Sequence, residues 1–365
     1  MRILLLLASL CVAAEEEAPR DLGALLREVR LRHGLPGMVG AIVAGGRVTA
    51  QGADGVRRHG AEERVTLEDR FHLGSCTKAM TATLCAMLVE EGMLAWGSTL
   101  GEVFPDLSPR MDPAWRGVTL EQLLHHRGGA PAGLDAGGLW GRLWAHKGTP
   151  AEARRALLEG VVVLPLEAPP GTKTIYSNGG YAIAGAMAEK VTGKAWEELM
   201  RARLFLPLGM TSAGFGAPGA SGALDQPRGH TAAGLAVEPG PGADNPVAIG
   251  PAGIAHATVG DWAKFVALHL RGEKDGSKLL SKEGFAQLHA QDGDHAKGWV
   301  VTTRPWGGGR VLTHSGSNTL WFCTVWIAPE RDFAVLVMTN QGGDKAAKAC
   351  DEACAAMIQD HLRPG

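Results

Sequence analysis

Two residues at the start of a predicted helix are a candidate nucleophile and base. Ser75 and Lys78 lie three positions apart, so a helix over residues 75–92 would place the hydroxyl and the amine on one face. A lysine can accept the serine proton if burial lowers its pKa from about 10.4. The simpler interpretation makes Ser75 an N-cap and Lys78 a solvated surface residue. The pair alone therefore does not establish catalysis.

A tyrosine and an asparagine form the second candidate group. The chain has only two tyrosines, so the Tyr-x-Asn pattern at Tyr176 and Asn178 rarely arises by chance. A phenol can relay a proton between nucleophile and leaving group, and an amide can hold a substrate carbonyl and the lysine together. The same residues also fit an Asn178-Gly179 turn before a helix, and the two interpretations are compatible.

The third group lies at the end of a predicted strand. His314 and Gly316 form a His-x-Gly pattern, in which the glycine allows another backbone segment to approach closely. The backbone N–H groups of Ser75 and Ser317 are candidates for an oxyanion hole. The His-x-Gly pattern also occurs three times elsewhere in the chain. Without the other two groups, a satisfied strand histidine is therefore the better interpretation of His314.

The elements expected around these residues are an early hairpin, a helical middle section and a late run of strands. The hairpin is predicted at residues 38–51, and a final helix at 345–361. Four late strands are expected at 298–304, 310–316, 319–329 and 333–340. We expect an α+β fold, in which hairpin and late strands form one antiparallel sheet flanked by the N- and C-terminal helices. A mostly α-helical domain would be inserted into it.

The chain is expected to consist of an export signal and one domain. Residues 1–14 have a positive start, an apolar run and small residues before three glutamates, which is typical of a signal peptide. The apolar run of about 12 residues is too short to span a bilayer. We therefore expect a periplasmic or extracellular protein without stable membrane insertion. Within residues 15–365, the predicted α/β part is about 15–70 and 255–365, and the α-helical part is about 71–254.

Composition excludes some classes of protein. The formal net charge of the 365 residues is −2, whereas nucleic-acid binding needs a clustered basic excess. The cysteines suggest no disulfide framework, and Cys76 is expected in the core. No motif calls for a metal ion or a cofactor. Residues 214–246 lack an apolar period and predict a long surface loop, a candidate lid over a cleft.

The ordered set of Ser-x-x-Lys, Tyr-x-Asn and His-x-Gly resembles the serine β-lactamase and penicillin-binding-protein superfamily. Within it, the chain is similar to the branch of class C β-lactamases, DD-peptidases and esterases. The likeness extends from about Gly45 to Asn340 and includes the segments VTLEQLLHHRGGAP and PGTKTIYSNGGYAIAGAMAEKVTGKAWEELMRARLFLPLGM. It implies a β-lactamase/transpeptidase-like fold.

The resemblance also implies a role for each motif residue. Ser75 would be the nucleophile, Lys78 its base or proton relay, and Tyr176 the general acid/base. The substrate-binding positions would be Asn178, His314, Gly316 and, through its N–H group in the oxyanion hole, Ser317.

Two positions depart from the family pattern. Arg127 replaces a small hydroxyl residue in the turn after the helix near residue 119, at the expected edge of the cleft. His314 stands where most β-lactamases have lysine. Because histidine carries less positive charge at neutral pH, it attracts a substrate carboxylate less strongly. Histidine here is shared with DD-peptidase-like and esterase-like relatives, which argues against a dedicated β-lactamase.

The predicted function is an exported serine hydrolase that forms an acyl-enzyme on Ser75. Its small-molecule substrate would be an ester or a D-amino-acid peptide, with a β-lactam as the third choice. The alternative is a penicillin-recognising binding or sensor protein that acylates without turnover. A structural role in the cell envelope has no sequence feature of its own.

Overall fold

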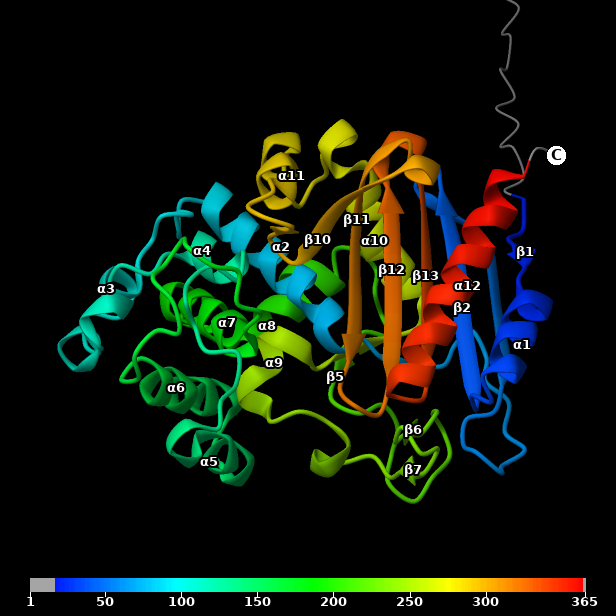
Figure 1. Cartoon of the computed structure of the whole chain (residues 1–365), viewed down its shortest axis with the longest axis horizontal. Helices are drawn as coiled ribbons and strands as arrows, with labels where there is room; N and C mark the ends of the chain where they lie inside the picture. The colour runs from blue at the N-terminus through cyan, green and yellow to red at the C-terminus, as the bar shows by residue number, and fades with distance from the viewer. Residues whose placement is uncertain (1–16, 364–365) are drawn as a thin grey trace, which may run out of the picture.

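The computed structural model describes residues 17–363 of the chain. The predicted signal peptide, residues 1–14, lies outside the described residues. A large sheet occupies one side of the molecule and a group of helices the other (Figure 1). The expected α+β arrangement is confirmed.

The large sheet has eight strands and combines the early hairpin with the late strands. In spatial order they are β1 (Arg20–Asp21), β3 (Arg47–Gly55), β2 (Gly37–Ala44), β13 (Phe333–Thr339), β12 (Phe322–Ala328), β11 (Gly309–Ser317), β10 (Trp299–Arg304) and β9 (His295–Ala296). Strand β2 pairs antiparallel with β13, from Met38 opposite Thr339 to Ala44 opposite Phe333. The prediction that the early hairpin and the late strands form one sheet is therefore correct. The short β1 pairs parallel with β3, so the sheet is not antiparallel throughout.

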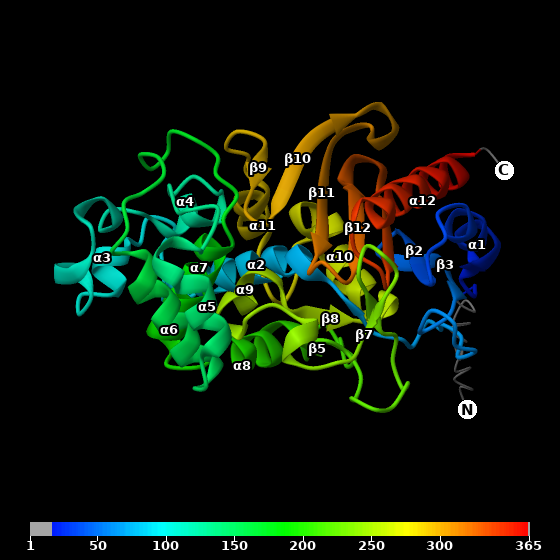
Figure 2. The same ribbon diagram turned by 60° about the horizontal axis from the view of Figure 1, so that its bottom comes forward.

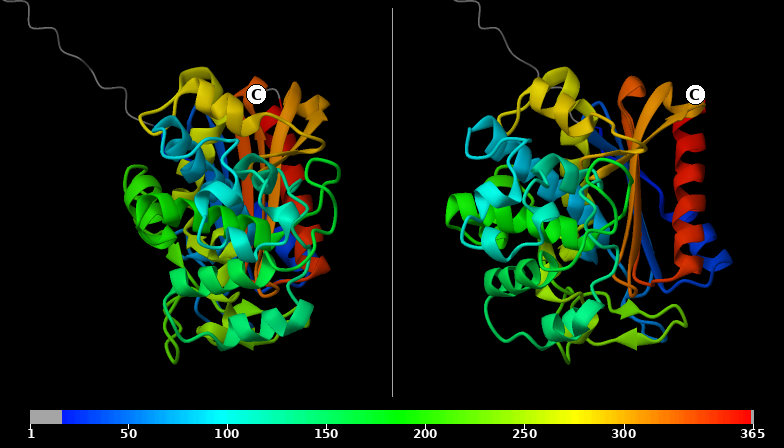
Figure 3. Two further views of the ribbon diagram at one scale, coloured as in Figure 1. Left: turned by 90° about the vertical axis from the view of Figure 1, so that its left-hand side faces the viewer. Right: turned by 60° about the vertical axis from the view of Figure 1, so that its left-hand side comes forward.

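Helices cover both faces of this sheet. Helices α1 (Gly23–Arg32) and α12 (Asp344–Leu362) lie on one face, and α10 (Val259–Asp275) packs on the other (Figure 3). Every residue of the central strand β13 is buried as a result. Its side chains alternate between the two apolar clusters, with Phe333 and Val335 on the α12 side and Ala334 and Leu336 on the other.

The remaining helices gather beside the sheet (Figure 2). They are α2 (Thr77–Glu90), α3 (Leu100–Val103), α4 (Leu120–Leu124), α5 (Leu139–Ala145), α6 (Pro150–Val161), α7 (Asn178–Thr192), α8 (Trp196–Met200), α9 (Gly250–Gly253) and α11 (Lys282–His289). Helix α2 is buried from Thr77 to Leu88 and contacts α7, α9 and α11. Across residues 17–363, no helix combines the length and the apolar character needed to cross a membrane.

Residues 214–246 are mostly exposed or half-buried, which agrees with the predicted surface loop. They contain the two-residue strands β5 (Gly214–Phe215), β6 (Gly229–His230) and β7 (Ala236–Val237), and β5 joins β4 (Phe71–His72) and β8 (Ala255–Ala257) in a small sheet. Arg228 and His230 are buried, because polar partners satisfy their side chains. The surface prediction does not hold for residues 227–230, which are buried, since burial here depends on hydrogen bonds rather than on an apolar pattern.

Candidate active site

Ser75 is half-buried in a tight turn that touches the end of strand β11. The turn, Gly74–Cys76, directly precedes helix α2. Gly74 has φ +46°, and a β-carbon there would lie 2.3 Å from the Ser317 nitrogen. A β-carbon on Gly316 would lie 2.0 Å from the carbonyl oxygen of Leu73. Both glycines are therefore needed for the turn and the strand to approach each other.

Lys78 extends from the first turn of α2 toward Ser75. Its Nζ atom lies 3.0 Å from Ser75 Oγ, 2.8 Å from Asn178 Oδ1 and 2.8 Å from the carbonyl oxygen of Ala252. The side chain is fully buried, and burial lowers the pKa of Lys78 to about 7. The interpretation of Lys78 as a solvated surface residue is therefore wrong.

Tyr176 and Asn178 lie on either side of the residue that caps helix α7. The Oγ atom of Ser177 accepts a hydrogen bond from Gly180 N at 3.1 Å and donates one to Pro131 O at 2.6 Å. These bonds fix the backbone from which the two side chains project toward Lys78.

The Tyr176 ring lies beside the amine. Lys78 Nζ is 4.7 Å from its centre, and 40% of the tyrosine is exposed. Burial of the hydroxyl raises the pKa of Tyr176 to about 12, although an interaction with the Ser75 hydroxyl acts in the opposite direction. The phenol therefore keeps its proton at neutral pH.

His314 brings the third motif to the same place. Its ring centre is 6.4 Å from that of Tyr176, and its Nδ1 atom lies 2.7 Å from the carbonyl oxygen of Ser315. Gly316 and Ser317 follow at the contact with the Ser75 turn. The structure thus gathers all predicted site residues in one region: Ser75, Lys78, Tyr176, Asn178, His314, Gly316 and Ser317.

His126 also lies at this site, although none of the three motifs includes it. It has φ +59°, its ring centre lies 4.4 Å from that of Tyr176, and its Nδ1 accepts a hydrogen bond from Ser177 N at 3.0 Å. Burial lowers the pKa of His126 well below its usual value, so the ring stays neutral, as an acceptor must. In the sequence, His126 could have been noticed from its position in the segment VTLEQLLHHRGGAP, which resembles the family.

Two other predictions concern neighbouring residues. Arg127, at 2.9 Å, forms an ion pair with Asp292, and so links its turn to the segment before β9. Cys76 is buried, with its Sγ 3.5 Å from that of Cys323, which agrees with a core position. Within the described part of the chain, no group of three or more His, Cys, Asp or Glu residues has the arrangement to hold a metal ion.

Comparison with known proteins identifies the family. A family model described as Beta-lactamase matches residues 15–355. The chain belongs to the β-lactamase family. Family membership makes it a serine hydrolase of the β-lactamase and penicillin-binding-protein superfamily.

The relatives differ in the activity that their names indicate. The chain is 28% identical over 329 residues to penicillin-binding protein 4 of Amycolatopsis lactamdurans, covering 86% of this chain and 83% of that protein. It is 32% identical over 171 residues to the lovastatin esterase of Penicillium rubens, covering 43% of this chain and only 42% of the esterase. A solved penicillin-binding-protein homologue from Pyrococcus abyssi has a TM-score of 0.73 at 26% identity, covering 92% of this chain and 76% of that one.

Proposed function

We propose that the chain is an exported hydrolase that cleaves esters or D-amino-acid peptides through an acyl-enzyme on Ser75. The observation that carries this proposal is the fully buried Lys78 amine at 3.0 Å from Ser75 Oγ. A serine hydroxyl becomes a nucleophile when an adjacent base takes its proton, and this amine is placed to do so.

The hydrogen bonds of Lys78 support its role as the base. Two fixed acceptors, Asn178 Oδ1 and the Ala252 carbonyl, lie 2.8 Å from Nζ. A neutral amine has two hydrogens for these acceptors, and its lone pair then points toward the remaining neighbour, the Ser75 hydroxyl. The pKa of about 7 makes the neutral form available at physiological pH.

Tyr176 is suited to the opposite proton transfer. Because its pKa is raised to about 12, the phenol can donate a proton to the leaving group as the tetrahedral intermediate collapses. The negative oxygen of that intermediate would be held by the N–H groups of Ser75 and Ser317. The neighbouring N–H groups are already occupied, because Gly74 N donates a hydrogen bond to His72 Nδ1 and Cys76 N donates one to Leu73 O.

The third motif and the relatives support esters and D-amino-acid peptides as the preferred substrates. His314 attracts a substrate carboxylate less strongly than a lysine would, which favours uncharged esters over penicillins. An esterase and a penicillin-binding protein are both among the similar proteins. β-Lactams remain the third substrate class. The predicted export rests on residues 1–14.

The test is the intact mass of the protein after mixing with a penicillin, with hydrolysis assays on a p-nitrophenyl ester and a D-alanyl-D-alanine peptide. We expect hydrolysis of the ester or the peptide, an acyl adduct on wild-type protein, and neither with Ser75→Ala. Full activity of Ser75→Ala would overturn the proposal. A stable adduct with no turnover of either substrate would instead indicate a penicillin sensor.

A further inference from the structure

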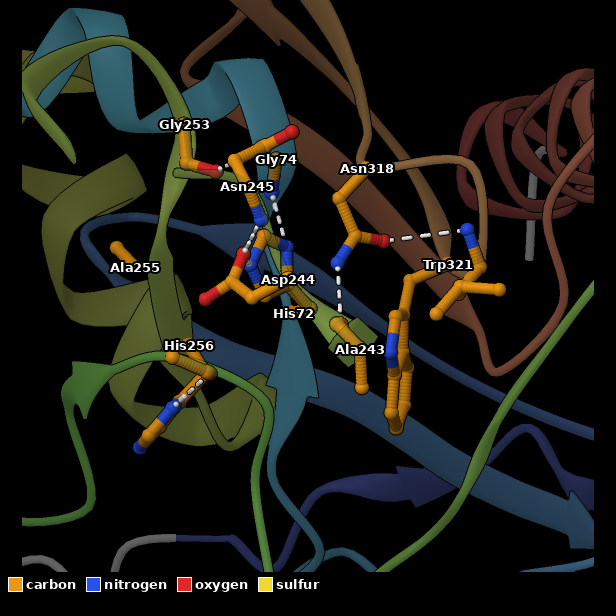
Figure 4. Close-up of polar contacts among 12 residues, drawn as sticks. His72, Gly74, Ala243, Asp244, Asn245, Gly253, Ala255, His256, Asn318 and Trp321 are labelled. Atoms are coloured by element: carbon orange, nitrogen blue, oxygen red, sulfur yellow. Dashed lines mark hydrogen bonds and ion pairs between the residues drawn. The ribbon is translucent and has the colours of Figure 1, made fainter. Parts of the chain in front are cut away.

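Three consecutive residues at the end of loop 214–246 are hydrogen-bonded to residues in three separate parts of the chain (Figure 4). Ala243 O accepts a hydrogen bond from Asn318 Nδ2 at 3.1 Å. The Oδ1 atom of Asp244 lies 2.7 Å from His72 Nε2. The next residue, Asn245, donates from Nδ2 to Gly253 O at 2.8 Å. We call these three residues the 243–245 segment.

Each of the three contacted segments leads directly to the proposed catalytic machinery. Asn318 follows Ser317, whose N–H group belongs to the proposed oxyanion hole. Gly253 follows Ala252, whose carbonyl oxygen accepts a hydrogen bond from Lys78. The 243–245 segment therefore lies among the parts that must hold their relative positions during the reaction.

The third contact, through His72, reaches the Ser75 turn itself. Gly74 N donates to His72 Nδ1 at 3.0 Å. Because Nδ1 is the acceptor, the proton of a neutral ring lies on Nε2 and is donated to Asp244. His72 is fully buried and Asp244 nearly so, and Asp244 Oδ1 also accepts a hydrogen bond from Asn245 N at 2.7 Å. The carboxylate thus fixes both the tautomer and the orientation of the ring.

We propose that Asp244, acting through His72, is a positioning residue that holds the Ser75 turn in the geometry of the oxyanion hole. The chain of contacts runs from the carboxylate to the imidazole and then to Gly74 N, one residue before Ser75. Gly74 has a left-handed backbone and touches Ser317 N, so a small rotation of this turn moves the Ser75 N–H group away from its partner. The proposal rests on the function proposed for Ser75.

His256 provides a matched control for His72. It lies opposite His72 in the pairing of β4 with β8, and its ring is buried. Its Nδ1 atom is 2.8 Å from the carbonyl oxygen of Gly216, so it also ties loop 214–246 to the small sheet. The ring of His256 is thus hydrogen-bonded to the start of the loop, whereas the ring of His72 is hydrogen-bonded to the Ser75 turn (Figure 4).

The experiment measures ester hydrolysis and the affinity for a boronic acid that mimics the tetrahedral intermediate. For Asp244→Ala we expect kcat to fall about 10- to 100-fold and boronate affinity to fall by a similar factor, with KM changed less than about threefold. Asp244→Asn keeps an acceptor oxygen for His72 and should recover most of kcat. The control His256→Gln should change kcat less than about threefold.

Two substitutions at His72 keep the proposal testable if Asp244→Ala does not fold. An asparagine at position 72 can accept the Gly74 N–H through an Asx-turn, whereas a leucine cannot. We therefore expect His72→Asn to retain much more kcat than His72→Leu. In the His72→Asn background, replacing Asp244 by alanine should have little further effect on kcat.

The outcomes separate this proposal from the proposed function. If the melting temperature of Asp244→Ala falls while kcat per folded molecule and boronate affinity stay unchanged, Asp244 is only structural and the inference is overturned. Equal kcat for His72→Asn and His72→Leu would overturn it as well. Full activity of Ser75→Ala would instead overturn the assignment of the nucleophile.

Discussion

At the residue scale, the chemistry of Lys78 depends on its surroundings more than on its identity. The amine is enclosed by the protein, and burial lowers its pKa to about 7 because the charged form loses its hydration. Asn178 Oδ1 and the Ala252 carbonyl hold it in place without adding a negative charge. A lysine in this environment is a base near neutral pH.

The first prediction is the pH profile of the wild-type protein. As the pH rises through about 7, Lys78 loses its proton and becomes competent as a base, so kcat/KM for an ester should rise and then level off. Lys78→Arg keeps the charge at every accessible pH and should lower kcat/KM by about 10²- to 10⁴-fold. The measurement is steady-state hydrolysis between pH 5.5 and 9 on both proteins. A flat wild-type profile across this range would contradict the assignment.

The second prediction concerns the charge at position 314. His314→Lys places a permanent cation close to Tyr176, and we expect acylation by a penicillin to accelerate about tenfold relative to an uncharged ester. Ser315→Lys is the control, because adjacent strand residues point to opposite faces of the sheet. Stopped-flow kinetics give the acylation rate constants for the penicillin and for the ester. Their ratio is compared between the wild-type protein and each variant. An equal gain in the control would mean that only net charge matters.

At the element scale, the site depends on contact between the Ser75 turn and strand β11. The strand was expected from a strand-like run bounded by turn residues, and the helix after Ser75 from its apolar spacing. Neither pattern indicates how closely the two elements approach. The short strands β4 (two residues) and β8 (three residues), which pair next to this contact, were also not predicted, because such short segments have no periodicity of their own.

The third prediction tests that contact directly. Gly316→Ala would place a β-carbon 2.0 Å from Leu73 O and 3.0 Å from Cys76 N, so the strand and the turn must separate. We expect kcat/KM to fall by at least about 100-fold, together with a loss of stability of about 1–3 kcal/mol. Gly141→Ala is the control, since it lies in helix α5 with open space around it and should be neutral or stabilising. Ester kinetics and thermal unfolding of both variants provide the measurement.

At the scale of the whole molecule, several histidines are buried in a neutral state. Burial lowers the pKa of His126, His256, His269 and His289, that of His256 to about 4. The last two lie between α10 and α11, with Nδ1 of His269 2.9 Å from Nε2 of His289. The lowered pKa values favour the neutral ring in the folded state, whereas the unfolded chain binds protons near pH 6.5.

The fourth prediction follows from this difference in proton binding. The stabilisation from these depressed pKa values is fully present above about pH 6.5 and is lost as the pH falls, because the unfolded state takes up more protons. Each such histidine contributes a slope of up to about 1.4 kcal/mol per pH unit. We expect His269→Gln to reduce the slope between pH 5 and 6 by about that amount.

Urea unfolding at several pH values provides the measurement for the fourth prediction. His59→Gln is the control, since that side chain is exposed. Equal slopes for wild-type protein and His269→Gln would contradict the prediction.

The helix that carries Ser75 and Lys78, the sheet of early and late strands, and the three motifs were all predicted from the amino-acid sequence. The helix, the individual strands and the motifs depend on periodicities and spacings within a few residues, so they can be recognised locally. The joining of β2 and β13 in one sheet was expected from general rules of topology, because these strands lie far apart in the chain. The fold as a whole buries Lys78 completely and packs His126 against Tyr176. It also brings Asp244 to His72 across 172 positions of the chain. Contacts between such distant residues depend on how the elements pack, because no local pattern specifies which buried polar groups will become partners.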